Sequence, residues 1–91
     1  MRLVWTKTAW ADYLYWQKND KKKLKRINEL IKATMREPFD GLGKPEALKH
    51  DLQGYRSRRI DTEHRLVYSF KNEELVGIVC WYYYSGMITY I

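Results

Sequence analysis

The first part of the chain contains apolar residues at helical spacing, preceded by a short segment typical of a strand. Residues 2–5, Arg-Leu-Val-Trp, are rich in β-branched and aromatic side chains and predict a strand. Thr6 or Thr8 then offers a hydroxyl that can cap the first amides of a helix. The apolar residues that follow at three-and-four spacing are Trp10, Tyr13 and Leu14, with Trp16 beside them. The pattern therefore predicts a strand followed by a helix that ends near Asn19 and Asp20.

A second helix is predicted directly after the first. Asp20 can cap it, and Pro38 closes it because proline lacks the amide hydrogen that a continuing helix needs. Its apolar stripe consists of Leu24, Ile27, Ile31 and Met35. The cations around that stripe are Lys21, Lys22, Lys25, Arg26, Lys32 and Arg36. Such a surface is either a solvated helix face or a binding surface for phosphates or an acidic partner.

The remainder of the chain is typical of strands joined by turns. The stretch from Pro38 to Glu46 contains both prolines and two of the five glycines, so we expect a loop there. Segments 55–60, 65–70 and 75–84 are rich in aromatic and β-branched residues and are separated by polar turns. We therefore predict an α+β fold with an N-terminal strand and two helices packed on one face of a twisted antiparallel sheet of four to five strands.

Composition narrows the class of protein. With 91 residues, 45% of them hydrophobic, the chain can form one core and one domain. Cys80 is the single cysteine, which excludes an intramolecular disulfide and suits a reducing cytoplasm. One cysteine and two histidines make no convincing zinc set, and no apolar run is long enough to span a bilayer, so we expect neither a metal nor a membrane. The net charge of +6 favours a polyanionic partner such as nucleic acid or an acidic protein.

Four arginines lie within ten residues on segments predicted to be strands: Arg56, Arg58, Arg59 and Arg65. Because strand side chains alternate between faces, some of them must stand on the sheet surface away from the helices, where guanidinium groups can bind phosphates. Direct pairing of Ile60 with Arg65 would place Arg59 and Arg65 on opposite faces, whereas a shift of one residue would place them together. The alternative to a phosphate site is a solvated sheet surface.

The loop before these strands carries a carboxylate close to cations. Glu46 is followed by Lys49 and His50 and then by the arginines, a combination that suggests cleavage of RNA. That reaction needs a base for the ribose 2′-hydroxyl, cations for the crowded phosphate and an acid for the departing oxygen. Taken alone, a carboxylate such as Glu46 in a loop is more often a solvated residue than a catalytic one. His50 and His64 are the imidazole candidates for the acid, although His64 falls in a predicted hairpin where turn hydrogen bonding is the simpler role.

Several blocks of sequence occur in the order and spacing of a known family. They are Trp10 with 12–17, 25–32, Pro38-Phe39, Gly41 with 43–46, 48–50, 57–60 and 63–68. Through these blocks, residues 1–84 closely resemble the YoeB/Txe toxins of the RelE superfamily. The resemblance implies one RelE-like toxin domain over residues 1–84 and a C-terminal extension over residues 85–91.

The resemblance also implies an activity and its partners. Members of that family are cytoplasmic toxins that cut mRNA in the A site of the 70S ribosome without a metal, and so inhibit translation. Attack by the 2′-hydroxyl leaves a 2′,3′-cyclic phosphate. The implied partners are an antitoxin of the YefM/Phd type, whose disordered acidic segment wraps the toxin, and a second copy of the toxin in a homodimer. Operator DNA is contacted only through the antitoxin complex.

The family's functional residues can be placed on matching positions of this chain. By resemblance, Glu46 is the general base and Arg65 the main phosphate-binding cation. Lys49 and Arg59 are supporting RNA-binding cations, and Glu63 supports the site or faces the ribosome. Tyr84 is the terminal aromatic residue that orients the mRNA.

The chain departs from the family where the general acid is expected. Family members typically end in Tyr-His-Tyr with the histidine as acid, whereas residues 82–84 here are Tyr-Tyr-Tyr. A tyrosine phenol has a reference pKa of about 10, against about 6.5 for histidine, so Tyr83 is a weaker acid and attenuated cleavage is expected. The alternative function is a catalytically weak protein that binds the antitoxin and helps to repress its own operon. A gyrase inhibitor of the ParE type has the same general fold, but Glu46 with Lys49 and Arg65 argues against it.

Overall fold

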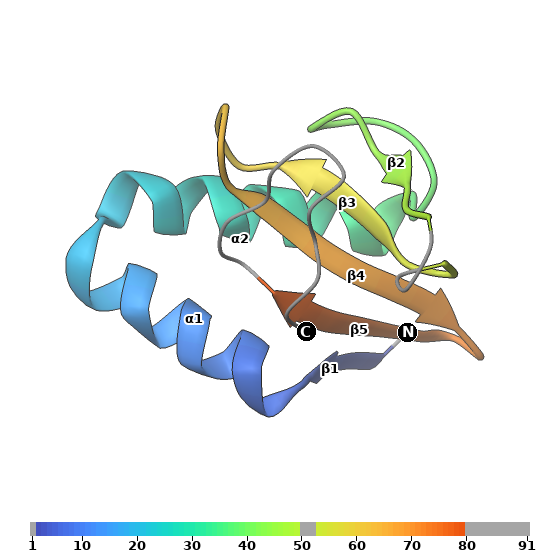
Figure 1. The fold of residues 1–91 in the computed structure, drawn as a ribbon, viewed down its shortest axis with the longest axis horizontal. Coiled ribbons are helices and arrows are strands. Elements are labelled where there is room, and N and C mark those ends of the chain that lie inside the picture. Colours follow the sequence, from blue (N-terminus) through green and yellow to red (C-terminus); the bar gives the residue numbers. More distant parts are fainter. Residues whose placement is uncertain (1, 50–52, 80–91) are drawn as a thin grey trace.

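The computed structural model describes residues 2–49 and 53–79 (Figure 1). Its elements, in chain order, are β1 (Arg2–Trp5), α1 (Lys7–Asn19), α2 (Lys21–Arg36), β2 (Glu46–Ala47), β3 (Arg56–Arg59), β4 (Arg65–Lys71) and β5 (Glu74–Val79). The strands form one sheet in the order β1-β5-β4-β3-β2, and the two helices pack on it, which confirms the predicted α+β architecture.

Both helices begin at the caps that the sequence predicted. The Thr6 hydroxyl accepts a hydrogen bond from the Ala9 amide at 3.1 Å, so Thr6 rather than Thr8 is the N-cap of α1. Asp20 is the single residue between the two helices. Its carboxylate accepts hydrogen bonds from the amides of Lys22 and Lys23 at 3.1 Å and caps α2. These contacts satisfy amides that have no partner within the helix, and Pro38 follows the end of α2 as expected.

The sheet is mixed, so the expectation of a wholly antiparallel sheet is wrong for one pair of strands. β2, β3, β4 and β5 pair antiparallel in sequence, but β1 lies parallel to β5, with Arg2 opposite Glu74. Parallel neighbours require a long crossover, and here most of the chain, including both helices, lies between β1 and β5. Glu46 also departs from the expected loop, because it forms the short edge strand β2 with Ala47.

The core lies between the helices and the sheet. Its buried members are Trp16, Ile27, Leu30, Ile60, Leu66, Tyr68 and Leu75. The predicted apolar face of α1 is only partly correct: Trp16 is buried, but Trp10 and Leu14 remain 46% and 42% exposed. The small residue Ala9 is fully buried instead, so α1 contacts the core through a face rotated from the one formed by its larger side chains. Within the described ranges, no helix combines the length and the apolarity needed to cross a bilayer.

Candidate active site

The strand register brings the predicted carboxylate and two predicted cations to one face of the sheet. Glu46 pairs with Ser57, and Arg59 pairs directly with Arg65. Because directly opposite residues share a face and alternate residues return to it, Glu46, Arg59 and Arg65 all stand on the face away from the helices. The question that the sequence left open is thus resolved in favour of a shared face for the two arginines.

The three residues lie on three neighbouring strands of this face. Glu46 and Arg65 are separated by two strand spacings and by two residues along the strands, which corresponds to roughly 12 Å between their Cα atoms. Arg59 lies on the strand between them and is exposed. Within the described ranges, the side chains of Glu46 and Arg59 make no hydrogen bond or ion pair with protein groups. This face therefore combines a solvent-accessible carboxylate with guanidinium groups, which suits a base and a phosphate-binding site.

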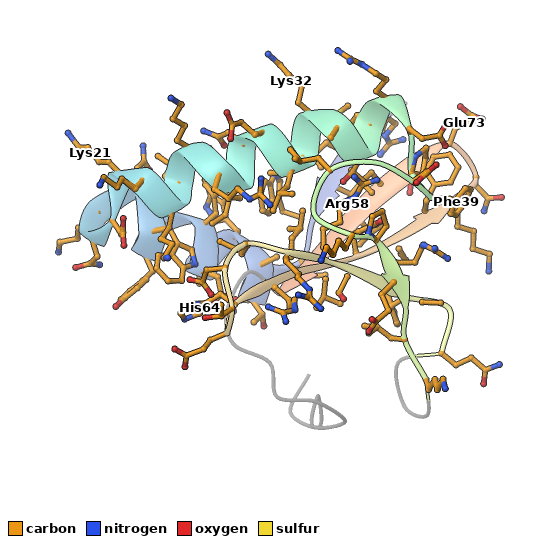
Figure 2. The ribbon with its side chains drawn as sticks, turned by 90° about the horizontal axis from the view of Figure 1, so that it is seen from above. Lys21, Lys32, Phe39, Arg58, His64 and Glu73 are labelled. Carbon is orange, nitrogen blue, oxygen red and sulfur yellow. The ribbon has the colours of Figure 1, made fainter. Side chains whose placement is uncertain are left out.

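The loop that leads to Glu46 is fastened by a buried arginine. Arg58 is fully buried on the helix side of β3 and points into the bend of the chain after α2 (Figure 2). Its guanidinium donates to the carbonyls of Glu37, Asp40 and Leu42 at 2.5, 2.9 and 2.7 Å. Its Nε donates to the Tyr68 hydroxyl at 3.2 Å, and that hydroxyl donates to the Pro38 carbonyl at 2.8 Å. The arginine thus satisfies carbonyls that the end of α2 and the following loop would otherwise leave unpaired.

Gly43 allows the same loop to approach the sheet. Its φ of +86° lies in the left-handed region, and its carbonyl accepts a hydrogen bond from the Arg59 amide at 2.8 Å. A Cβ at this position would lie 2.6 Å from Leu30 Cδ2 and 3.0 Å from Arg58 Cβ. A glycine is therefore needed for both its conformation and its lack of a side chain. The loop reaches Glu46 three residues later, so this contact helps to define where the carboxylate lies.

Arg65 is held by the turn that precedes it. Its Nη1 donates to the carbonyls of Asp61 and His64 at 2.7 and 3.1 Å. The Asp61 carboxylate in turn accepts from the amides of Glu63 and His64 at 2.7 and 2.6 Å. Lys23 reaches the same carboxylate from α2, with 2.7 Å between Nζ and Oδ2.

These contacts keep the Asp61 carboxylate ionised. Burial raises the pKa of Asp61, but the hydrogen bonds from Lys23 and from the backbone and ring of His64 lower it by more, so it lies well below its usual range. The hydrogen bond to Asp61 likewise raises the pKa of Lys23. Both shifts favour the charged form, so at neutral pH the ion pair between Asp61 and Lys23 joins the turn to α2.

Some of the other predicted site residues lie within the described part of the chain and others lie outside it. Lys49 is exposed and lies three residues beyond Glu46, after the end of β2. Glu63 is exposed in the turn next to Arg65. The His64 ring lies 2.8 Å from the Asp61 carboxylate and packs edge-on against Trp16, which supports the turn role expected for it rather than that of an acid. His50, Tyr83 and Tyr84 lie outside the described residues.

Three residues of this region were missed by sequence reasoning. Arg58 was grouped with the surface arginines, although its alternation with Arg59 and its position two residues before Ile60 indicated the buried face. Asp61 is one of several polar residues in a turn, and Lys23 is one of several lysines at the start of a helix. Nothing in the neighbouring sequence distinguishes either of them from an ordinary surface residue. Only the packing of α2 against the β3–β4 turn brings them together.

The described residues contain no group of three or more histidine, cysteine, aspartate or glutamate side chains arranged to hold a metal ion.

Known proteins are similar to this chain over most of its length. Residues 5–84 match the family described as YoeB-like toxin of bacterial type II toxin–antitoxin system. The chain is 56% identical over 84 residues to Toxin YoeB of Escherichia coli K12, an alignment that covers 92% of this chain and 100% of that protein.

Solved structures of similar proteins have the same fold. The YoeB/ParE toxin from Agrobacterium tumefaciens superposes with a TM-score of 0.89 at 49% identity, covering 92% of this chain and 100% of that one. YoeB from Staphylococcus aureus has been solved as a dimer, with a TM-score of 0.86 at 46% identity, covering 92% and 98% of the two chains. It has also been solved as a heterotetrameric complex with the antitoxin YefM, with a TM-score of 0.84 and the same identity and coverage.

Proposed function

Because this chain belongs to the YoeB-like toxins of bacterial type II toxin–antitoxin systems, we propose that it is an endoribonuclease that cuts mRNA in the ribosomal A site. The observation that carries the proposal is the shared face of Glu46, Arg59 and Arg65, which the strand register defines. A carboxylate and two guanidinium groups on one accessible surface suit a reaction in which a proton is removed and negative charge accumulates on a phosphate.

Each group has a role in the proposed reaction. Glu46 takes the proton from the ribose 2′-hydroxyl as that oxygen forms a bond to the adjacent phosphorus. Arg65 and Arg59 stabilise the additional negative charge on the phosphate oxygens, and Lys49 adds positive charge near the base. The bond from phosphorus to the 5′-oxygen then breaks, the departing oxygen receives a proton, and the products are a 2′,3′-cyclic phosphate and a 5′-hydroxyl.

The proton for the departing oxygen is assigned to Tyr83, with Tyr84 orienting the mRNA. Since a phenol donates its proton less readily than an imidazolium near neutral pH, cleavage is slower than with histidine at this position. Tyr83→His should therefore raise the single-turnover rate, by up to about 100-fold if proton donation limits it. An unchanged rate would contradict the assignment.

The proposed macromolecular partners follow from charge and from the relatives. The exposed side of α2 carries Lys21, Lys25 and Lys32 around a shallow groove of about 300 Å³, with Leu24, Asn28 and Glu29 between them. Lys21 and Lys32 project outward from the helix (Figure 2). These cations suit the phosphate backbone of ribosomal RNA. By similarity to the Staphylococcus aureus structures, we assign a YefM-type antitoxin and a second copy of this chain as protein partners.

Toeprinting of a defined mRNA tests the function directly. On 70S ribosomes with an empty A site, the wild-type chain should produce a new 3′ end within the A-site codon. The same mRNA without ribosomes, or with tRNA in the A site, should remain intact. Glu46→Ala should abolish the cut, whereas Glu73→Ala, a change of an exposed carboxylate in the β4–β5 turn, should leave it unaltered.

Absence of any cut with the wild-type chain would contradict the nuclease proposal. Retained high affinity for the antitoxin in that case would favour the second candidate, an antitoxin-binding co-repressor, which the tyrosine at position 83 makes a specific alternative.

A further inference from the structure

The position of Arg65 depends on the backbone of the turn between β3 and β4. One nitrogen of its guanidinium, Nη1, donates to two turn carbonyls, those of Asp61 and His64. The same turn is closed by hydrogen bonds from the amides of Ile60 and Asp61 to the His64 carbonyl, at 2.9 and 3.3 Å. A change in the turn conformation would therefore move the groups that orient the guanidinium.

The Asp61 carboxylate is the centre of that turn. Its Oδ1 accepts from the amides of Glu63 and His64, and the His64 ring nitrogen Nδ1 lies 3.0 and 2.8 Å from its two oxygens. A side chain that accepts hydrogen bonds from the amides two and three residues later fixes a turn in the same way as a helix cap. The carboxylate thus determines where the carbonyls of Asp61 and His64 point.

Helix α2 supports the turn at two points. Lys23 Nζ lies 2.7 Å from Asp61 Oδ2, and one helical turn later Arg26 Nη2 donates to the Arg59 carbonyl at 3.2 Å. Trp16 of α1 packs edge-on against the His64 ring, with 5.0 Å between the ring centroids. The turn is consequently held on the helical layer as well as by its own hydrogen bonds.

We propose that Asp61 and Lys23 are positioning residues for Arg65. The ion pair fixes the turn to α2, the turn carbonyls hold Nη1, and the guanidinium is thereby oriented toward a phosphate on the face that it shares with Glu46 and Arg59. This assignment rests on the proposed nuclease function. It adds two residues that do not touch the RNA, one of them on a helix on the opposite side of the sheet.

Single-turnover cleavage on programmed ribosomes measures the consequence. Displacement of a catalytic group by about 1 Å can cost about 100-fold in rate, so Asp61→Asn and Lys23→Gln should each slow cleavage by about 10- to 100-fold. The ribosome concentration giving half the maximal rate should stay unchanged, because neither residue contacts the ribosome in this assignment. Lys23→Arg keeps the charge and should restore most of the rate. Lys18→Gln removes an equivalent charge from an exposed position on α1 and is the matched control.

A readout independent of catalysis separates this proposal from the nuclease proposal. In NMR spectra of the ¹⁵N-labelled chain, the guanidinium signals of Arg65, assigned by their loss in Arg65→Lys, should report slow rotation about the Nε–Cζ bond in the wild type and in Lys18→Gln. Rotation should become fast in Asp61→Asn and Lys23→Gln. Urea unfolding curves identify any variant that is not folded. Lys23 is only half-buried, so Lys23→Gln still tests the proposal if Asp61→Asn does not fold.

Each outcome decides the proposal. Faster Arg65 rotation in Lys23→Gln supports it, even if the wild-type chain proves not to cut mRNA and the nuclease proposal fails. Unchanged Arg65 signals in folded Lys23→Gln overturn it, whatever happens to the rate. If the wild-type chain cuts mRNA, cleavage by Lys23→Gln as fast as by Lys18→Gln overturns it as well.

Discussion

Arg58 is a fully buried charged residue that has no carboxylate partner among the described residues. Arg58 is surrounded by backbone carbonyls and the Tyr68 hydroxyl. Burying a charge is costly unless hydrogen bonds compensate, and a planar guanidinium can donate to several acceptors at once. This residue thereby joins the end of α2, the loop before Glu46 and strand β4.

Replacing this arginine by lysine tests its role. Arg58→Lys keeps the charge but leaves several carbonyls without a donor, so the free energy of unfolding should fall by about 2–4 kcal/mol. Urea denaturation measures the change, with Arg36→Lys as a control at an exposed position. Equal midpoints for the two variants would contradict the role given to Arg58.

The Asp61 carboxylate should make the free energy of unfolding depend on pH. Its pKa is lower in the folded chain than in the unfolded chain, so its stabilising effect is complete above the ordinary aspartate pKa of about 4. That effect is lost as the pH falls from there toward the lower pKa of the folded state. Asp61→Asn should therefore lower the free energy of unfolding by about 1–2 kcal/mol at pH 7, and the difference from wild type should shrink at pH 3. A difference of equal size at both pH values would show that ionisation of Asp61 does not contribute.

At the scale of elements, local signals predicted the helices well and the sheet less well. The caps Thr6 and Asp20 and the terminating Pro38 act within a few residues, so the sequence was sufficient to place α1 and α2. The parallel pairing of β1 and the shared face of Arg59 and Arg65 depend on contacts between distant segments. They could not be derived from spacing alone, because one residue of register reverses the face of every side chain.

The buried face of α1 shows the same limit. Trp10 and Leu14 have the spacing of core residues, yet they are partly exposed, while Ala9 is buried. Trp10 stacks on Tyr13 with 5.8 Å between ring centroids and contacts Trp5 edge-on at the same distance, so the aromatic residues form a cluster at the surface. Aromatic residues at helical spacing predicted an amphipathic helix correctly but misplaced its buried side.

The loop between α2 and β2 should be sensitive to a single methyl group. Gly43→Ala places a Cβ against Leu30 and imposes a left-handed backbone on alanine, so it should cost about 1–3 kcal/mol of stability. Gly54→Ala is the control for backbone strain, because Gly54 also has a positive φ but a Cβ there meets no atom within 4 Å. Urea denaturation should show a larger decrease in the free energy of unfolding for Gly43→Ala than for Gly54→Ala. An equal decrease in both variants would indicate that backbone strain alone, and not the close contact with Leu30, accounts for the effect.

At the scale of the molecule, the two sides of the sheet are assigned different tasks. The side away from the helices presents Glu46, Arg59 and Arg65, while the helical layer supplies the core and the contacts that hold the β3–β4 turn. The resemblance supplied the candidate residues of the first side, and the strand register places Glu46, Arg59 and Arg65 together on it. The contacts that hold the turn could not be predicted, because they depend on how α2 packs.

The charge of the whole molecule leads to a prediction about binding. With a net charge of +6, ribosome association should weaken as salt rises, because counterions are released from RNA phosphates. Replacing Lys21, Lys25 and Lys32 together by Gln should reduce the slope of log K against log salt by about one for each lysine that contacts a phosphate. The same replacement of Lys7, Lys18 and Lys71, which are exposed elsewhere, should change it less. Equal slopes for the two triple variants would argue against α2 as the RNA-binding side.

The most direct test of the proposed catalytic face is the single-turnover rate and product of cleavage on ribosomes with an empty A site, for the wild type, Glu46→Ala and Arg65→Ala. The proposed mechanism predicts a product ending in a 2′,3′-cyclic phosphate, with the rate reduced at least about 100-fold in each variant. A wild-type rate retained in folded Glu46→Ala, or a product ending in a 3′-hydroxyl, would contradict it.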